Sequence, residues 1–234
     1  DLTGKEITTP NDLLGISYIK AIKKYNYNIK PETIQRTNHY HDKELNDDIS
    51  SATAIRKALK ENKDVSNYVP NYVIPYLNNL HYIEDYYNLL KYKILTEDDL
   101  SKYQTVDEGI EQSLKKEILN SNSYEELVNN LKSKRYTYNK ITRMLLHILC
   151  NFTKEKAKSF NKITYIRLLG FNENGRKYLN YIKKKIPVPI ISKINREKDL
   201  MLEFELQTTN IYALTTNNDL IKQEYINHLN KKGE

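Results

Sequence analysis

The sequence predicts an α/β protein in which helices predominate, and three observations support this fold class. A helix, a short strand and a second helix are expected in succession within the first 66 residues. Helical patterns then continue to residue 131, and a strand–helix–strand pattern begins at residue 163. Helices that alternate with strands in this way are typical of mixed α/β folds with parallel strands.

The composition excludes several classes of protein. Of the 234 residues, 39% are hydrophobic and 29% are charged, which is sufficient for a packed core. Cys150 is the only cysteine, so a disulfide or a cysteine-based zinc site within one chain is excluded. We expect Cys150 to be a buried structural thiol. No apolar run is long enough to span a bilayer, so we expect no membrane partner. The single cysteine fits a reducing compartment, so we expect a cytoplasmic protein.

Charge is distributed unevenly along the chain. The net charge is +7, but residues 132–198 contain 18 basic and 3 acidic side chains, a net charge of +15. Residues 61–131 contain 6 basic and 13 acidic side chains, a net charge of −7. A basic segment of this size indicates a polyanionic partner. The alternative is a solvated lysine-rich surface, which would leave the neighbouring acidic segment unexplained.

The first helix is predicted to begin at Pro10 and Asn11, with Asn11 as its N-cap. It is predicted to end near residues 25–28. Residues 33–38 alternate enough to predict a short strand that carries Arg36, and a polar loop follows it.

The sequence ISSATAIRKALKEN, residues 49–62, places hydroxyl side chains and an arginine at a helix start. Thr53 is the predicted N-cap of a helix from Ala54 to Asn62. Unpaired backbone N–H groups and the helix dipole make such a start a binding site for anions. The Ser51 and Thr53 hydroxyls and the Arg56 guanidinium can add donors that suit a phosphate. The alternative is an ordinary capped helix with a solvated arginine.

Residues 68–131 are predicted to be helical throughout. Ser123, with Glu126 three residues later, forms a capping-box pattern and therefore predicts a helix start. No motif in this region carries chemistry, so we expect a helical bundle or a connector.

Residues 132–152 predict an amphipathic helix with basic side chains on its exposed face. Its apolar positions at helical spacing are Ile141, Leu145, Ile148, Leu149 and Phe152. Its basic side chains are Lys134, Arg135, Lys140 and Arg143. His147 lacks a partner at metal-ligand spacing, so we expect it to be structural.

The rest of the chain predicts a second, small α/β unit. Residues 163–170 and 188–192 have strand patterns, and residues 172–185 between them have a helical one. Such a β-α-β run implies parallel strands. Helical patterns follow at 198–214 and 218–230.

Four segments in this order resemble one protein family. They read TPNDLLGISYIKAI, ISSATAIRKAL, KRYTYNKITRMLLHIL and YIRLLGFNENGRKYL. Together they resemble the bacterial tRNA(Met) cytidine acetate ligases, a family of nucleotidyltransferases that carry a His-x-x-His-type motif near the N-terminus. The resemblance extends over nearly the whole chain, and residues 9 to about 179 are its specific part.

The resemblance implies an enzyme that joins acetate and ATP into acetyl-adenylate and then acetylates N4 of the wobble cytidine in elongator tRNA(Met). Family members begin with a strand and a histidine-containing ATP loop, and this sequence contains neither. We therefore expect the C-terminal part of such a protein, inactive by itself. Residues 1–66 would be the C-terminal half of the nucleotidyltransferase domain, residues 67–131 a helical region, and residues 132–234 a basic α/β region that binds tRNA.

The family positions for ATP correspond to residues in three motifs of this sequence. Asn11 in PND and Arg36 in TIQR match residues implied in ATP binding, and Ser51, Thr53 and Arg56 match the phosphate motif of the superfamily. The resemblance implies ATP, accompanied by Mg²⁺, although no carboxylate cluster here has metal-ligand spacing. No residue of this sequence matches a catalytic position.

The tRNA interface is expected in the basic region. Lys134, Arg135 and Arg143 are the predicted contacts to phosphates, and Tyr136 or Tyr138 is a candidate for stacking on an unpaired base.

Two other functions compete with this one. An adenylyltransferase for a small phosphate-containing substrate would share the phosphate motif, but it would not explain the basic segment. A noncatalytic RNA-binding module would explain the basic segment, but it would give Arg36 and the SATAIR motif no role.

Overall fold

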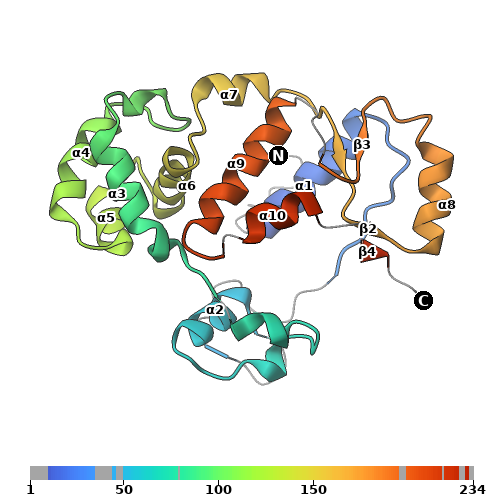
Figure 1. Ribbon diagram of the computed structural model, residues 1–234, viewed down its shortest axis with the longest axis horizontal. Helices are drawn as coiled ribbons and strands as arrows, with labels where there is room; N and C mark the ends of the chain where they lie inside the picture. The colour runs from blue at the N-terminus through green and yellow to red at the C-terminus, as the bar shows by residue number, and fades with distance from the viewer. Residues whose placement is uncertain are drawn as a thin grey trace, which may run out of the picture. The chain divides into compact units, whose positions relative to one another are not determined.

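The computed structural model describes residues 10–34, 44–45, 50–78, 80–194, 199–217, 219–226 and 230–231. The chain divides into two compact units, Asp1–Asn79 and Leu80–Glu234. Helices predominate in the part of the chain that the structure describes, and the few strands are short and parallel (Figure 1). The predicted fold class is therefore confirmed.

The described part of the first unit contains the α-helices α1 (Pro10–Lys24) and α2 (Ala52–Lys60). Helix α1 begins at Pro10, as expected of a proline whose missing N–H is not needed in the first turn. Asn11 therefore lies inside the first turn, and its prediction as the N-cap is wrong. The helix ends where it was predicted to end, and Asn26 just beyond it has a left-handed backbone with φ of 50°.

The second predicted helix is present, but a different residue caps it. Ser51 has an extended backbone, and its hydroxyl oxygen accepts a hydrogen bond from the Ala54 N–H at 3.1 Å. Thr53 is therefore the second residue of α2 and not its N-cap. Two 3₁₀ helices, η1 (Ser66–Tyr68) and η2 (Ile74–Asn78), complete the described part of this unit.

The predicted strand at residues 33–38 lies only partly within the described residues. Thr33 and Ile34 are not in a strand, and residues 35–38, Arg36 among them, lie outside the described residues.

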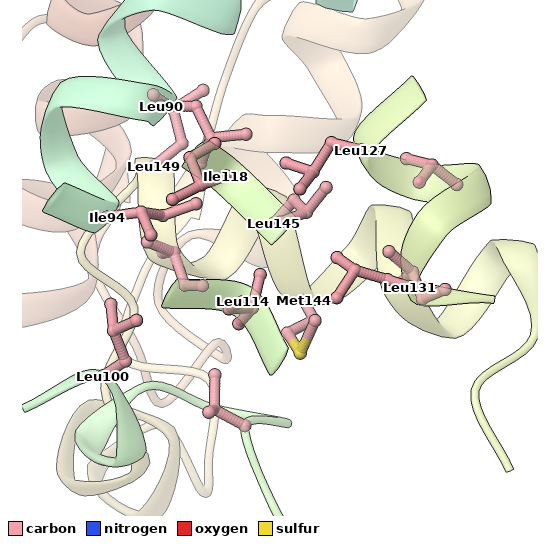
Figure 2. Packing of buried hydrophobic residues seen from close by; sticks show 14 of the residues in the cluster. Leu90, Ile94, Leu100, Leu114, Ile118, Leu127, Leu131, Met144, Leu145 and Leu149 are labelled. Atoms are coloured by element: carbon pink, nitrogen blue, oxygen red, sulfur yellow. The ribbon is translucent and has the colours of Figure 1, made fainter. Parts of the chain in front are cut away.

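The second unit begins with a helical core. Its elements are η3 (Ile83–Tyr86), α3 (Tyr87–Thr96), η4 (Leu100–Lys102), α4 (Ile110–Asn120), α5 (Tyr124–Leu131) and α6 (Tyr138–Leu149). Leucine and isoleucine side chains from these elements meet in one hydrophobic cluster, which also contains Met144 (Figure 2). Four of the five predicted apolar positions of α6 are buried there, and Phe152, just beyond the helix, is half-buried.

The capping prediction at Ser123 is confirmed in part. The Ser123 hydroxyl oxygen accepts a hydrogen bond from the Glu126 N–H at 3.1 Å. The Glu126 carboxylate accepts from the N–H of Asn122 at 2.7 Å instead of from that of Ser123. Helix α5 therefore begins at Tyr124, as the sequence predicts.

The remainder of the second unit is the predicted small α/β part. Its elements are α7 (Lys154–Ser159), β1 (Ile166–Arg167), β2 (Gly170–Phe171), α8 (Glu173–Ile182), β3 (Ile190–Ile191), α9 (Leu200–Ala213), α10 (Asp219–Ile226) and β4 (Asn230–Lys231). Strand β1 pairs in parallel with β3, and β2 pairs in parallel with β4. The β-α-β prediction is thus confirmed, and a second buried cluster forms around Ile191, Ile194 and Leu202.

The division into three functional regions stays a prediction. The main hydrophobic cluster extends from Tyr86 to Leu149, so it includes side chains on both sides of residue 131. In the described part of the chain, every helix is too short or too polar to cross a membrane.

Candidate functional site

The start of α2 has the backbone geometry of an anion site. The first helical backbone bond is donated by Ile55 to the carbonyl of Ser51 at 3.0 Å. The N–H groups of Ala52 and Thr53 come before it and therefore have no acceptor within the helix. No acidic side chain occupies the first turn, so nothing there repels an anion.

Ser51 is the buried member of this site. Its residue is only 4% exposed, and its side chain caps the helix through Ala54. Its role in the fold is therefore to fix the first turn of α2, which determines where the free N–H groups of the helix point. The Thr53 side chain is exposed.

Arg56 and Lys57 follow one turn into the helix and differ in their environment. Lys57 forms an ion pair with Glu44 at 2.5 Å, and its hydrogen bond lowers the pKa of the Glu44 carboxyl. Arg56 is exposed and forms no ion pair with any of the described residues. Arg56 is thus the cation of this turn that is available to a ligand.

Of the five predicted ATP residues, Ser51, Thr53 and Arg56 lie together at the start of α2. Asn11 is exposed in the first turn of α1, and no hydrogen bond joins it to Ser51, Thr53 or Arg56 among the described residues. Arg36 lies outside the residues that the structure describes. The ATP site therefore stays a prediction, for which the start of α2 has a suitable geometry.

The second unit contains a cavity of about 930 Å³ that the sequence did not reveal. Its apolar lining comes from η3, α6, β3, α9, α10 and the segment that follows β1, and Arg167 and Glu224 are among its polar groups. The lining residues are spread from position 81 to position 224, so no local motif signals the cavity.

Two charged groups of this cavity, Arg167 and Glu224, bind each other. The Arg167 guanidinium donates to the carboxylates of Glu205 on α9 and Glu224 on α10. Glu224 also accepts a hydrogen bond from the Thr209 hydroxyl at 2.7 Å. Burial would raise the pKa of Glu224, but the bonds from Arg167 and Thr209 lower it overall. These contacts explain how α9 and α10 are held to β1.

Cys150 also lines the cavity. Its thiol is half-buried, and this burial raises its pKa, so the reactive thiolate is disfavoured. This environment agrees with the prediction of a structural thiol.

Lys134, Arg135 and Arg143 are all exposed, as a phosphate-binding role requires. Lys134 and Arg135 precede α6, and Arg143 lies within it. Arg135 is 3.9 Å from the carboxylate of Glu108, so its charge is partly balanced within the protein. Whether these side chains contact tRNA stays a prediction.

Tyr136 is unsuitable for stacking on a base. It is 5% exposed, and its hydroxyl donates to the backbone carbonyl of Asp107 at 2.6 Å. Tyr138 is 49% exposed, so only this tyrosine of the pair remains a candidate. The Nδ1 atom of His147 lies 2.9 Å from the Gln104 carbonyl, and this contact agrees with the predicted structural role.

Comparison with known proteins supplies the family. The model of the HIGH Nucleotidyl Transferase family matches residues 1–226. A tRNA(Met) cytidine acetate ligase of Geobacillus sp. is 37% identical over 243 residues, which cover 95% of this chain and 61% of the relative. That of Anoxybacillus flavithermus is 39% identical over 225 residues, with 89% of this chain and 56% of the relative covered.

Solved structures show the same similarity. Apo TmcAL of Thermotoga maritima superposes with a TM-score of 0.79 at 25% identity, over 93% of this chain and 59% of that one. The TmcAL structure bound with alpha-thio ATP gives a TM-score of 0.75 at 25% identity, over 94% of this chain and 59% of that one. The chain thus spans about three-fifths of the length of these relatives.

Proposed function

The chain belongs to the HIGH nucleotidyl transferase family, and from this premise we propose that it is part of an ATP-dependent tRNA(Met) cytidine acetate ligase. The observation that carries the proposal is the extent of the similarity, since relatives of that name match about nine-tenths of the chain at 36–39% identity. The proposed reaction activates acetate as acetyl-adenylate and then acetylates N4 of the wobble cytidine in elongator tRNA(Met).

The first step needs alignment and charge stabilisation rather than a protein nucleophile. A carboxylate oxygen of acetate attacks the α-phosphorus of ATP, and the bond to the leaving pyrophosphate breaks. Negative charge grows on the phosphate oxygens during this step. Donors fixed at the start of α2 would stabilise this charge, because a fixed donor costs no reorganisation during the reaction.

The ATP site would be formed by Asn11, Arg36, Ser51, Thr53 and Arg56. Ser51 orients the first turn of α2 as its cap, so the N–H groups of Ala52 and Thr53 would bind phosphate oxygens. Arg56 would add a charge-assisted bond to the same phosphates. In support, TmcAL of Thermotoga maritima has been solved bound with alpha-thio ATP. A magnesium ion would accompany the nucleotide, held mainly by phosphate oxygens and water.

In the second step, the N4 amine of cytidine attacks the acetyl carbonyl of acetyl-adenylate. AMP leaves, and the amine loses a proton. Because the base must leave the stack of the anticodon loop, the protein has to bind the loop as well as the nucleotide. Lys134, Arg135 and Arg143 would contribute to this binding through tRNA phosphates.

The test uses the full-length protein with ATP, acetate and a transcript of elongator tRNA(Met). We expect pyrophosphate release and N4-acetylcytidine, detected by mass spectrometry of the digested tRNA. A transcript with uridine at the wobble position should remain unmodified. Adenylylation of another substrate, without acetylcytidine, would favour an adenylyltransferase. Binding of tRNA without any use of ATP would favour a noncatalytic RNA-binding module.

A further inference from the structure

Helix α8 packs on the protein through a narrow inner face. Gly175, Leu179 and Ile182 are its half-buried positions, at the spacing of one helical face. A Cβ atom at Gly175 would lie 3.0 Å from the Cβ of Phe171, so the helix is seated directly against β2. This close approach fixes which side of α8 is turned to solvent.

The outer face of α8 is aromatic and basic. Tyr178 and Tyr181, three positions apart, are 62% and 66% exposed. The Nζ atom of Lys185 lies 3.6 Å from the centre of the Tyr181 ring. The exposed lysines around these two rings are Lys177, Lys183, Lys184 and Lys185. We call these two tyrosines and four lysines the α8 surface.

Little negative charge balances this surface. Glu173 is the only acidic residue in the sequence between positions 156 and 196, and its carboxylate is bound to Arg176 at 2.8 Å. By contrast, the loop before α6 has acidic neighbours, because Glu108 is 3.9 Å from Arg135. The α8 surface therefore combines more uncompensated positive charge with two exposed rings.

We propose that the α8 surface binds an unpaired segment of RNA, with its tyrosines stacked on bases and its lysines at phosphates. The proposal rests on the proposed function, since tRNA is the RNA concerned, and it adds a contact that the sequence motifs did not predict. Stacking on aromatic rings and charge pairing with the backbone are the usual contacts of single-stranded nucleic acid.

An RNA partner fits this surface better than an anionic membrane. A helix that lies in a membrane interface inserts aliphatic and aromatic side chains on one side. In α8 the aliphatic side chains Leu179 and Ile182 are turned toward the protein, and only tyrosines flanked by lysines remain outside. An RNA strand offers bases that stack on tyrosine rings and phosphates that bind lysines, and the α8 surface presents both kinds of side chain next to each other.

The first test exploits the absence of tryptophan from the chain. In the Tyr181→Trp variant of the 234-residue chain, all tryptophan emission comes from the α8 surface. We expect an elongator tRNA(Met) transcript to quench this emission and to shield it from iodide. The matched control is Tyr92→Trp on α3, where the replaced tyrosine is 69% exposed but lies in the acidic segment. Equal quenching in both variants, or none at Tyr181→Trp when tRNA is bound, would overturn the proposal.

The second test separates the contribution of the two tyrosine rings to tRNA binding from that of the four lysine charges. Changing both Tyr178 and Tyr181 to alanine should weaken tRNA binding by about five-fold or more, whereas the two phenylalanine changes should preserve it. Changing the four lysines to glutamine should reduce the slope of log affinity against log salt by about 0.7–0.9 for each tRNA phosphate that the protein no longer neutralises.

The outcomes distinguish this proposal from the proposed function. If the unchanged chain binds no tRNA, the α8 surface is excluded as an RNA site, whereas the proposed function is judged by acetylcytidine formation in the full-length protein. If the α8 variants bind tRNA as the unchanged chain does, only the α8 surface is excluded. Binding to vesicles that contain anionic lipid, abolished in the α8 variants while tRNA binding is kept, would assign the surface to a membrane instead. Circular dichroism of each variant checks that the fold is intact.

Discussion

The hydroxyl of Tyr103 donates a hydrogen bond to the carboxylate of Glu97 at 2.6 Å. Tyr103 is almost fully buried, and Glu97 also binds Lys102 at 2.7 Å and Lys93 at 3.1 Å. The bonds from Lys102, Tyr103 and Lys93 lower the pKa of Glu97 to about 2, from an ordinary value of 4.5. This group of contacts connects the end of α3 to the loop that follows η4.

We predict that the stability contributed by Glu97 depends on pH in the acid range. Because its pKa is lower in the folded state, the ionised carboxylate stabilises the fold above the unfolded pKa near 4.5. That contribution is lost as the pH falls toward about 2. Glu97→Gln should lower the free energy of unfolding by about 1.5 kcal/mol at pH 7, and by less at pH 3.

Urea denaturation at several pH values checks this prediction. Glu125→Gln is the matched control, since Glu125 is an exposed carboxylate that forms no ion pair with a described residue. If the destabilisation by Glu97→Gln stays constant from pH 7 to pH 3, the ionised carboxylate of Glu97 contributes no more to the free energy of unfolding than the protonated form.

The capping of α2 leads to a second prediction, which separates Ser51 from Thr53. Ser51→Ala removes the acceptor of the Ala54 N–H and should cost about 1 kcal/mol of unfolding free energy. Thr53→Ala should change it little, since that side chain is exposed and helical. Urea denaturation of the two variants measures both changes in unfolding free energy. A larger loss in Thr53→Ala than in Ser51→Ala would identify Thr53 as the cap.

A third prediction concerns ATP binding by the full-length protein. Arg56→Ala and Arg36→Ala should each weaken ATP binding about ten-fold or more, because a charge-assisted bond to phosphate is worth about 1.5–3 kcal/mol. Lys57→Ala is the control within the same turn, since Lys57 is already paired with Glu44. Calorimetry that finds ATP affinity unchanged by both arginine variants would remove these residues from the site.

A fourth prediction is that the 234-residue chain makes no acetyl-adenylate from acetate and ATP. Its five histidines do not form the His-x-x-His-type motif that the family carries in its ATP loop. The full-length protein should release labelled acetyl-AMP in the same assay. Acetyl-AMP formed by the 234-residue chain would show that this chain suffices for the first step.

Periodicity predicted the helices of the second unit well, and α6 shows why. Ile141, Leu145 and Ile148 recur on one helical face, and burial of that face in the main cluster stabilises the helix that the pattern predicts. Caps were harder to predict. Serine and threonine are both common capping residues, and the structure identifies Ser51 as the cap through its extended backbone and its bond from the Ala54 N–H.

The candidate ATP site could be proposed only where its residues are close in sequence. Ser51 and Arg56 belong to one motif, so the start of α2 was found, whereas the cavity around Arg167 and Glu224 joins residues 57 positions apart. Tyr136 shows a second limit. Lys134 and Arg135 before it are basic and exposed, but its ring is buried and its hydroxyl is bound to the backbone of Asp107.

The last prediction concerns the basic residues at α6 and tests the charge argument independently of the family. If Lys134, Arg135 and Arg143 contact phosphates, tRNA binding by the chain should release counterions, and log affinity should fall linearly with log salt. Each alanine change should weaken binding and flatten the slope by up to about one unit. Arg135→Ala should have the smallest effect, because Glu108 already balances part of its charge. Lys116→Ala, an exposed lysine in the acidic segment, should have none. Filter binding across a salt series measures these slopes. A slope that the triple variant leaves unchanged would mean that these three side chains are only solvated, and tRNA binding would then depend on other basic residues of the chain.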